Sequence, residues 1–534
     1  LHYEDKYIPM ERKDTRMTLP MKKVATSQFH DYYEAQLRMN LICLRYFFEF
    51  TDTQGEKVYY GNYEFDKECI TNRDRMFDCP QNLREEEMFE VPEWAANKVV
   101  YQIFPSRFAA TQPVDKELWY KAPITPMDDL HGNLRGIIEH LDYIKDLGID
   151  VVYLTPIFKS NSCHKYDTID YYQVDPSFGT TEDLKELVQK SHERGMKVVL
   201  DAVYNHSGRE FFAFQDILEK GEKSKYLDWY FIDELPPKGE WGEIPNFKCF
   251  GYYGGMPKLN LKNPEVEKYI TDVACYWIKE CDIDGWRLDV GDEISHFFWK
   301  NFRKAIKAVK KDMLIIGEIW HYAGDFLEGD EWDTVMNYPF YLNLIDLLAD
   351  EKINVSQFVQ NLGYLKGRLN KKCYPLMWNL IDSHDTARFL HLCNDNKKKQ
   401  HLAAAFQLLL PGMPMVYYGD EYAMPGANDP DCRRGMYWDE EYQDKEMYNW
   451  YKKLMQIRKT HACIVEGAMI ETIANDDEDT IVMIRKNGEE TIAMLFNCGS
   501  SAKEFDEYAK KYNLLTDSEF SGKVEGLDAA VIVL

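Results

Sequence analysis

Four short stretches of the sequence end in side chains that could do acid–base or nucleophilic chemistry. They are DAVYNH (201–206), GWRLDV (285–290), GEIW (317–320) and SHD (383–385). Besides Asp201, which opens the first stretch, they supply three carboxylates and two imidazoles: Asp289, Glu318, Asp385, His206 and His384. Hydrolysis of a glycosidic bond needs two carboxyl groups in different surroundings, one as nucleophile and one as proton donor. These stretches therefore predict that kind of chemistry.

The stretch DGWRLDV places Arg287 two residues before Asp289. Side chains alternate along a strand, so these two groups share one face while the apolar residues around them share the other. A guanidinium beside a carboxylate stabilises its ionised form, which suits Asp289 to attack an anomeric carbon. Glu318 follows the apolar run MLII, where partial desolvation favours a protonated acid. The two acids are thus expected to have different roles.

Each stretch alone has a plainer interpretation. An Arg-x-Asp pair is most often an ion pair on a solvated face, and a carboxylate that ends a strand is most often a helix cap. A single histidine is most often an ordinary surface or core residue. Four such ends in one chain are harder to explain this way. Barrel enzymes build their sites at the carboxyl ends of several strands, so the four ends predict one shared site.

The elements that would position these residues begin at about residue 98, where short apolar runs start to alternate with helical patterns. The runs are VVYQIF (99–104), VVYLTPIF (151–158), KVVLDAVY (197–204), GWRLDV (285–290), MLIIGEIW (313–320), TVMNYP (334–339), LMWNLID (376–382) and PMVYYGD (414–420). Segments such as EDLKELVQKSHERG lie between them, with apolar residues at helical spacing. Eight strand–helix repeats predict an α/β fold, a (β/α)8 TIM barrel.

Further β-rich segments flank the predicted barrel. LICLRYFFEF and EKVYYGNYEF predict an N-terminal β-sandwich over residues 1–92, and IVMIRKNGEETIAMLFN predicts a hairpin in a C-terminal β-sandwich over residues 460–534. The barrel itself is expected over 93–459. Within it, the Gly-, Pro- and aromatic-rich segment of about 207–262 follows the third strand and predicts an inserted domain B.

Composition narrows the possible partners. No basic stripe interrupts the formal net charge of −26, so we expect no nucleic-acid partner. The sequence contains no run of about 18 apolar residues and no basic-then-apolar start, so we expect no membrane span. The 12 cysteines include no CxxC pair and favour a cytoplasmic location. Because the chain starts with Leu1, a trimmed product stays an open interpretation.

The four stretches, in this order, resemble the α-amylase superfamily of retaining α-glucan hydrolases, glycoside hydrolase family 13. Three further motifs are similar to those of its neopullulanase, cyclomaltodextrinase and maltogenic amylase group: MPKLN (256–260), HKYD (164–167) and NDPDCR (428–433). The resemblance covers nearly the whole chain. It implies a barrel with domain B, a C-terminal β-sandwich and an N-terminal β-sandwich of carbohydrate-binding type.

The resemblance also implies roles for individual residues. Asp289 would be the nucleophile, Glu318 the acid/base, and Asp385 a third acid that grips sugar hydroxyls. Tyr166 would stack on the sugar that donates the bond, and Trp320 would lie toward the leaving group. The remaining residues would orient the sugar and the nucleophile: His206, Arg287 and His384.

The sequence departs from the group in two places. Where the group usually has V-A-N-E after the nucleophile, this chain has V-G-D-E (290–293), which puts linkage preference in question. The loop RFAATQPVDKELWY lacks the acidic pattern of a calcium site. Asn205 matches a calcium ligand of ordinary α-amylases, but Glu293 stands where those enzymes often have histidine. We therefore expect no metal ligand and no cofactor, with calcium the one alternative left open.

The predicted function is hydrolysis of α-1,4-glucosidic bonds in maltooligosaccharides, cyclodextrins or pullulan. The alternatives are an ordinary α-amylase, an oligo-1,6-glucosidase, or a non-catalytic binding protein on the same scaffold. An α-glucan oligosaccharide is the expected partner, and the chain is expected to be a monomer or a homodimer.

Overall fold

The structure is a computed structural model that describes residues 1–8, 15–37, 41–80, 89–239 and 242–534. The chain forms two compact units. One unit comprises Leu1–Phe89 with Gln360–Arg368, and the other comprises Glu90–Val359 with Leu369–Leu534. No helix in the described ranges combines the length and the apolarity needed to cross a membrane.

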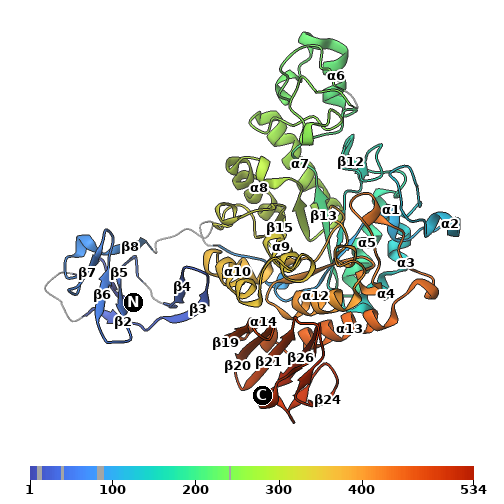
Figure 1. The fold of residues 1–534 in the computed structure, drawn as a ribbon. Coiled ribbons are helices and arrows are strands. Elements are labelled where there is room, and N and C mark those ends of the chain that lie inside the picture. The colour runs from blue at the N-terminus through green and yellow to red at the C-terminus, as the bar shows by residue number, and fades with distance from the viewer. Residues whose placement is uncertain (9–14, 38–40, 81–88, 240–241) are drawn as a thin grey trace. The chain divides into compact units, whose positions relative to one another are not determined.

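The larger unit contains an eight-stranded parallel barrel (Figure 1). Its strands are β9 (Val100–Ile103), β10 (Val151–Leu154), β13 (Lys197–Ala202), β14 (Gly285–Leu288), β15 (Leu314–Gly317), β16 (Thr334–Val335), β17 (Trp378–Asn379) and β18 (Met413–Tyr417). They follow the order β16-β15-β14-β13-β10-β9-β18-β17, and a parallel bridge between Met336 and Trp378 closes the ring. Every predicted run overlaps one of these strands, so the barrel prediction is confirmed.

The helices around the barrel begin and end where their sequences predict. Helix α5 (Thr181–Glu193) starts with a capping box in which Thr180 and Asp183 satisfy each other's backbone N–H groups. Helix α7 (Pro264–Cys281) starts at a proline behind the Asn263 cap. The main helices of the larger unit that follow are α8 (His296–Val309), α9 (Tyr338–Leu344), α12 (Lys397–Leu409) and α13 (Lys445–Thr460). Their apolar faces cover the barrel, whose strands are almost wholly buried.

The segment between β13 and α7 forms the protrusion that Figure 1 shows around helix α6 (Phe212–Lys220). Isolated antiparallel bridges hold it together, including His206 with Lys258 and Cys249 with Pro257. Two strands of the preceding crossover, β11 (Phe158–Lys159) and β12 (Asp170–Val174), form a separate hairpin. The exact domain bounds expected from the sequence stay predictions.

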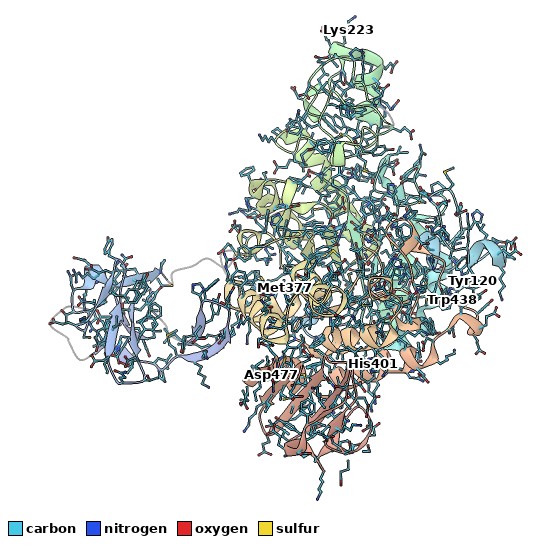
Figure 2. All side chains as sticks on the ribbon, viewed as in Figure 1. Tyr120, Lys223, Met377, His401, Trp438 and Asp477 are labelled. Carbon is cyan, nitrogen blue, oxygen red and sulfur yellow. The ribbon has the colours of Figure 1, made fainter. Side chains whose placement is uncertain are left out.

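The C-terminal part of the larger unit is antiparallel. Strands β20 (Thr480–Asn487) and β21 (Glu490–Asn497) form the predicted hairpin. They belong to a six-stranded sheet with the order β19-β20-β21-β26-β23-β24, whose other strands are β19 (Ala468–Asn475), β26 (Asp528–Val533), β23 (Tyr512–Asn513) and β24 (Ser518–Glu519). A cleft of about 620 Å³ lies where this part meets helices α12 and α13. His401 on α12, which Figure 2 labels between these helices and the C-terminal strands, lines it.

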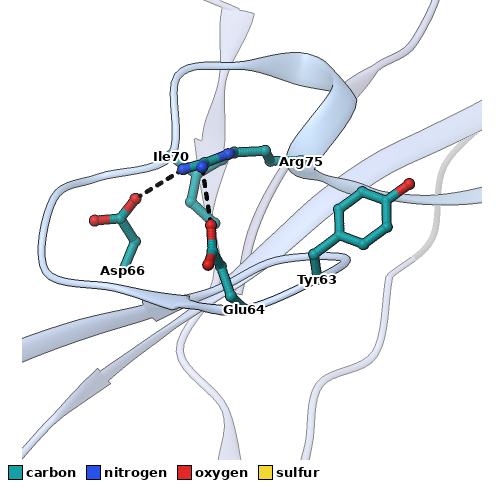
Figure 3. Close-up of a pocket in the computed structure, with 5 residues that line it drawn as sticks. All are labelled: Tyr63, Glu64, Asp66, Ile70 and Arg75. Carbon is teal, nitrogen blue, oxygen red and sulfur yellow. Dashed lines mark hydrogen bonds and ion pairs between the residues drawn. The ribbon is translucent and has the colours of Figure 1, made fainter.

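The smaller unit contains a six-stranded antiparallel sheet in which β5 (Cys43–Thr51) pairs with β6 (Lys57–Tyr60), the two runs that the sequence singles out. Figure 3 shows a small pocket in this unit, where Arg75 forms ion pairs with Glu64 (2.8 Å) and Asp66 (3.1 Å). Its volume is only about 10 Å³, room for about one water molecule. This pocket is too small for a sugar.

Candidate active site

The predicted strand ends meet at one rim of the barrel. Asp201 lies opposite Arg287 in the parallel register of β13 and β14. Asp289 follows the last residue of β14, and Glu318 follows the last residue of β15. The rim is therefore the C-terminal one, where barrel enzymes carry their active sites.

Arg287 joins three carboxylates. Its side chain is fully buried, and its Nη1 lies 3.2 Å from Asp201 Oδ1 and 3.0 Å from Asp289 Oδ1. Its Nη2 lies 2.8 Å from Glu318 Oε1. The Nη1–H groups donate hydrogen bonds to both aspartates, whereas the approach of Nη2 to Glu318 is a charge contact only. One cation thus serves three buried acids, and its charge opposes the rise in pKa that burial causes in each of them.

Asp289 has one oxygen fixed and one free. Oδ1 accepts from Arg287, while Oδ2 is buried without a hydrogen-bond donor among the described residues. Burial raises the pKa of Asp289 well above its ordinary value, the charge of Glu318 adds to this, and Arg287 opposes it. A buried carboxylate oxygen without a donor is costly unless something else meets it. This oxygen is therefore open to a ligand at the rim.

Glu318 is held in a different way. Its Oε2 accepts a hydrogen bond of 2.9 Å from the backbone N–H of Val290. Burial raises the pKa of Glu318, and the charge of Asp385 raises it further, while Arg287 and the indole of Trp320 lower it. Val290 has φ +47° and ψ +45°, a left-handed conformation that is costly for a β-branched residue. The strained turn directs this N–H at the carboxyl group.

Tyr166 and His384 form a second layer beside the acids. Their rings stack with centroids 5.5 Å apart and planes at 6°. The hydroxyl of Tyr166 donates to Asp201 Oδ2 at 3.0 Å, as does that of Tyr153 at 2.6 Å. Burial raises the pKa of Asp201 to about 6. Asp201 therefore anchors both Arg287 and Tyr166.

Hydrogen bonds fix the protonation of His384. The amide of Gln102, on β9, donates to Nδ1 at 2.8 Å, so Nε2 carries the proton toward Tyr166 and Asp385. Burial lowers the pKa of His384 well below its ordinary value, so the ring is neutral. Asp385 is 30% exposed and faces Arg433, whose Nη2 is 3.4 Å from its Oδ1.

His206 and Trp320 lie in contrasting environments. His206 is fully buried, its Nε2 donates to the carbonyl oxygen of Tyr166 at 3.1 Å, and its ring stacks on Phe250. Burial lowers its pKa to about 3. Trp320 is 43% exposed and stacks on Tyr338 with centroids 3.9 Å apart. His206 is thus built to position Tyr166, whereas Trp320 can meet a ligand.

The oxygens that would bind calcium already hold a cation. Lys258, from the MPKLN motif, bonds through Nζ to Asn205 Oδ1 and lies 2.9 Å from Glu293 Oε2. Nζ also donates to the backbone oxygen of Glu293 at 3.3 Å. An ammonium held by these three oxygens does not fit a calcium site at Asn205. Nor do the described residues offer three or more His, Cys, Asp or Glu side chains arranged around a metal position.

Four residues of the site were not among those singled out: Asp201, Gln102, Arg433 and Lys258. Asp201 lies inside a predicted strand, and Arg433 and Lys258 lie inside quoted motifs, so their sequence context pointed to them. Gln102 interrupts the otherwise apolar run VVYQIF, and a polar residue inside a buried strand is the signal that could have found it.

Two buried carboxylates at the C-terminal rim of a parallel barrel place the protein among the glycoside hydrolases. Residues 102–467 match the model of the alpha amylase catalytic domain, and residues 1–81 match that of the alpha amylase N-terminal ig-like domain. The chain belongs to the alpha-amylase family, whose members hydrolyse α-glucans.

Relatives with defined names cover nearly the whole chain. A cyclomaltodextrinase of Geobacillus thermopakistaniensis is 42% identical over 519 residues, 96% of this chain and 88% of the relative. An intracellular maltogenic amylase of Bacillus subtilis is 39% identical over 489 residues, 90% of this chain and 82% of the relative. A solved cyclomaltodextrinase structure matches with a TM-score of 0.93 at 37% identity, covering 99% of this chain and 93% of that one.

Proposed function

We propose that the enzyme cleaves α-1,4-glucosidic bonds with retention of configuration, with Asp289 as nucleophile and Glu318 as acid and base. The observation that supports this most directly is the state of Asp289, whose Oδ1 is bound by Arg287 while Oδ2 has no donor among the described residues. The expected separation of the two carboxyl groups is about 5–5.5 Å, the spacing of retaining enzymes.

In the first step Asp289 Oδ2 attacks the anomeric carbon. Glu318 gives its proton to the glycosidic oxygen as the bond to the leaving group breaks, and a glycosyl ester of Asp289 forms. Burial and the charge of Asp385 raise the pKa of Glu318, which favours the protonated form that this step needs. Arg287 keeps its aligned donors on the aspartates and stabilises the attacking anion.

In the second step Glu318 acts as a base. Its carboxylate takes a proton from water, the water oxygen attacks the anomeric carbon, and the ester bond to Asp289 breaks. Two inversions leave the product in the α configuration. Asp385, partly exposed beside His384 and Arg433, is placed to accept hydrogen bonds from sugar hydroxyls, and Tyr166 to contact the sugar ring.

Proton NMR of freshly released maltose tests this mechanism. The α anomer is expected to accumulate first and then equilibrate with the β anomer. If the β anomer forms first, the enzyme inverts, and Asp289 is not a covalent nucleophile.

For the substrate, we infer a cyclomaltodextrinase-like preference for cyclodextrins and maltooligosaccharides, with pullulan also cut. The names of the relatives and the MPKLN motif (256–260) support this assignment. Products from β-cyclodextrin, pullulan and soluble starch are compared side by side at equal enzyme concentration. A higher kcat/KM on β-cyclodextrin than on starch is expected, and the reverse order would favour an ordinary α-amylase.

We also infer an intracellular location. All twelve cysteines are free thiols in the structure, which suits a reducing compartment, and one relative is named an intracellular maltogenic amylase. Monomer and homodimer both stay within the proposal, and sedimentation equilibrium distinguishes them.

A further inference from the structure

The indole of Trp332 is wedged between the backbones that hold the two catalytic carboxylates. Trp332 is fully buried in the loop before β16. A Cβ atom placed on Gly317 would lie 2.1 Å from Trp332 Cε3, and one placed on Gly291 would lie 2.8 Å from Cζ2. Real Cβ atoms essentially never come so close to another atom, so the ring touches both glycines directly.

These glycines sit at sensitive places in the chain. Gly317 immediately precedes Glu318. Gly291 follows Val290, the residue that links Asp289 to the hydrogen bond with Glu318. The bulk of one side chain therefore separates the turn after the nucleophile from the strand end that carries the acid.

Packing rather than hydrogen bonding holds the indole in place. Its ring stacks on Phe326 with centroids 4.1 Å apart and planes at 4°, and it meets Trp299 edge-on. Trp299 in turn donates from Nε1 to the carbonyl oxygen of Gly291 at 2.9 Å. Among the described residues, Nε1 of Trp332 has no hydrogen-bond partner, so its volume is what Trp332 contributes.

We propose that Trp332 is a positioning residue that sets the separation of Asp289 and Glu318, and that Gly291 is its steric partner. The inference rests on the catalytic roles proposed above. It also gives a physical reason for glycine in V-G-D-E, because a methyl group at position 291 would push against the ring. A larger residue at position 291 should then be tolerated only together with a smaller ring at position 332.

A double-mutant cycle tests the coupling. Gly291→Ala and Trp332→Phe are made singly and together, and kcat is measured on maltotriose. Each single change is expected to lower kcat by about 10- to 100-fold, because a small misplacement of catalytic groups is costly. The double variant should recover to within about threefold of the parent, because the smaller ring makes room for the methyl group.

Trp286→Phe is the matched control. Trp286 is also fully buried with an unpartnered Nε1 among the described residues, but it packs on Phe158 and Tyr204 and abuts neither glycine. Adding Gly291→Ala to this control should give no rescue. If the fold-losses in kcat of Gly291→Ala and Trp332→Phe multiply in the double variant, the proposal is overturned. This holds even if either single variant folds poorly.

A second readout separates positioning from a general loss of folded enzyme. On an aryl glycoside with a good leaving group the first step needs little proton transfer, so Trp332→Phe should lose less there than on maltotriose. Equal losses on both substrates would contradict a role in placing the acid. The proposed catalytic roles fail separately, if Glu318→Gln keeps near-parental activity on maltotriose.

A cleft of about 620 Å³ lies between α12, α13 and the C-terminal strands. Sites for small ligands commonly measure about 300–1,000 Å³. The rings of His401 and Trp450 stack there with centroids 3.7 Å apart, fixed by a hydrogen bond from Trp450 Nε1 to the His401 carbonyl oxygen and by a contact of His401 with Asp528. The cleft thus contains a rigid aromatic platform.

The charge around this platform is nearly balanced, although the whole chain is strongly acidic. Three lysines and four acids line the cleft: Lys397, Lys398, Lys453, Asp444, Glu446, Glu525 and Asp528. The side chains of Lys398, Glu446 and Asn449 form no hydrogen bond or ion pair with other described residues. An aromatic platform with free donors and acceptors and little net charge suits a neutral, hydroxyl-rich ligand.

We infer that this cleft is a second binding site for an α-glucan chain, separate from the catalytic rim. Calorimetric titration of the full chain carrying Glu318→Gln with maltoheptaose tests it, because the sugar then stays uncleaved. Two binding events are expected. Adding Trp450→Ala should raise the dissociation constant of one event by at least about tenfold and leave the other in place.

The matched control is Trp94→Ala, which removes a partly buried indole that also donates to a backbone oxygen, at Asp312, but lies outside the cleft. It should keep both events. The pair Glu446→Ala and Asn449→Ala, at exposed positions, should weaken the same event as Trp450→Ala. A single event in the parent, or two events that none of the cleft variants changes, would overturn the second site.

Discussion

Two buried arginines of the barrel, Arg287 and Arg388, lie among carboxylates and differ in the groups that accept their hydrogen bonds. Arg388 donates to Asp420 Oδ1 at 2.9 Å and to the backbone oxygens of Tyr418 and Cys432. Arg287 faces three carboxylates, and its partner Asp289 keeps an oxygen without a donor among the described residues. Backbone oxygens are fixed and do not take part in acid–base chemistry, whereas the carboxylates that share Arg287 can gain or lose a proton.

The two acids beside Arg388, Asp382 and Asp420, also interact with each other. Asp382 accepts from the backbone N–H of Phe389 at 2.7 Å, and its carboxyl group hydrogen bonds to that of Asp420. Burial raises the pKa of both acids. Asp382 Oδ1 and Asp420 Oδ2 have no other donor among the described residues, so a proton shared by the two carboxyl groups would satisfy them. The same residue types thus differ in role with their partners, because Arg388 donates mainly to backbone oxygens whereas Arg287 lies on three carboxylates.

The largest loss of activity is expected from substitutions of the two carboxylates beside Arg287. Asp289→Asn and Glu318→Gln should each lower kcat on maltotriose by on the order of 1,000-fold or more, because one removes the nucleophile and the other the proton donor. Circular dichroism should show an unchanged fold, since the amides keep the shape. Near-parental turnover in either variant would sink the assignment of that residue.

A lysine at each arginine position in turn tests whether Arg287 and Arg388 have different roles. Arg287→Lys should lower turnover by about 100-fold, because a single ammonium cannot serve three carboxylates at once. Arg388→Lys should instead leave turnover of the folded enzyme nearly unchanged and lower the free energy of unfolding by about 1–3 kcal/mol, because buried backbone acceptors lose their donors. Thermal melts and kcat are measured on both variants. The same pattern of loss in both would remove the distinction.

A smaller effect concerns pH and the Asp382–Asp420 pair. A raised pKa in the folded state means that the protonated form stabilises the fold, and that this contribution is lost as pH rises above about 4, the ordinary carboxyl value, through the raised one. Asp420→Asn keeps a neutral donor at every pH. The difference in melting temperature between parent and variant, measured at pH 5 and pH 8, should therefore shift in favour of the variant at pH 8. A difference that does not change with pH would contradict the shared proton.

The smallest effect is expected from removal of metal. Lys258 already provides a cation for Asn205 and Glu293, so activity should survive exhaustive dialysis against a chelator. Lys258→Ala is dialysed in the same way for comparison, because this variant leaves the oxygens of Asn205 and Glu293 without the ammonium. Loss of parental activity in chelator, restored by calcium, would show that the resting enzyme depends on the ion.

Much of the fold was predictable because its signals are local. The eight apolar runs gave all barrel strands, and the alternation in DGWRLDV correctly placed Arg287 and Asp289 on one face. The distribution of Arg287 over Asp201 and Glu318 was not predictable, since it depends on side chains that three separate strands bring together.

Other features of the site depend on spatial neighbours that no sequence spacing reveals. His206 was expected to orient the sugar or the nucleophile, and that role stays a prediction; the structure adds its bond to the backbone of Tyr166. The replacement of a metal by Lys258 and the contact of Trp332 with Gly291 both involve residues far apart in the chain. Motif order can identify the chemistry but not these packing partners.

The closure of the barrel has a kinetic consequence. Strands β16 and β17 have two residues each, and a bridge between Met336 and Trp378 joins them, supported by bonds of Asn337 to Trp378 and Asn379. Local opening follows the region with the fewest backbone bonds, so amide hydrogens along this seam should exchange with solvent before those of β13 and β14. Met336 Sδ also contacts Nε of Arg287 at 3.4 Å, so each opening of the seam would momentarily loosen the arginine that binds Asp289.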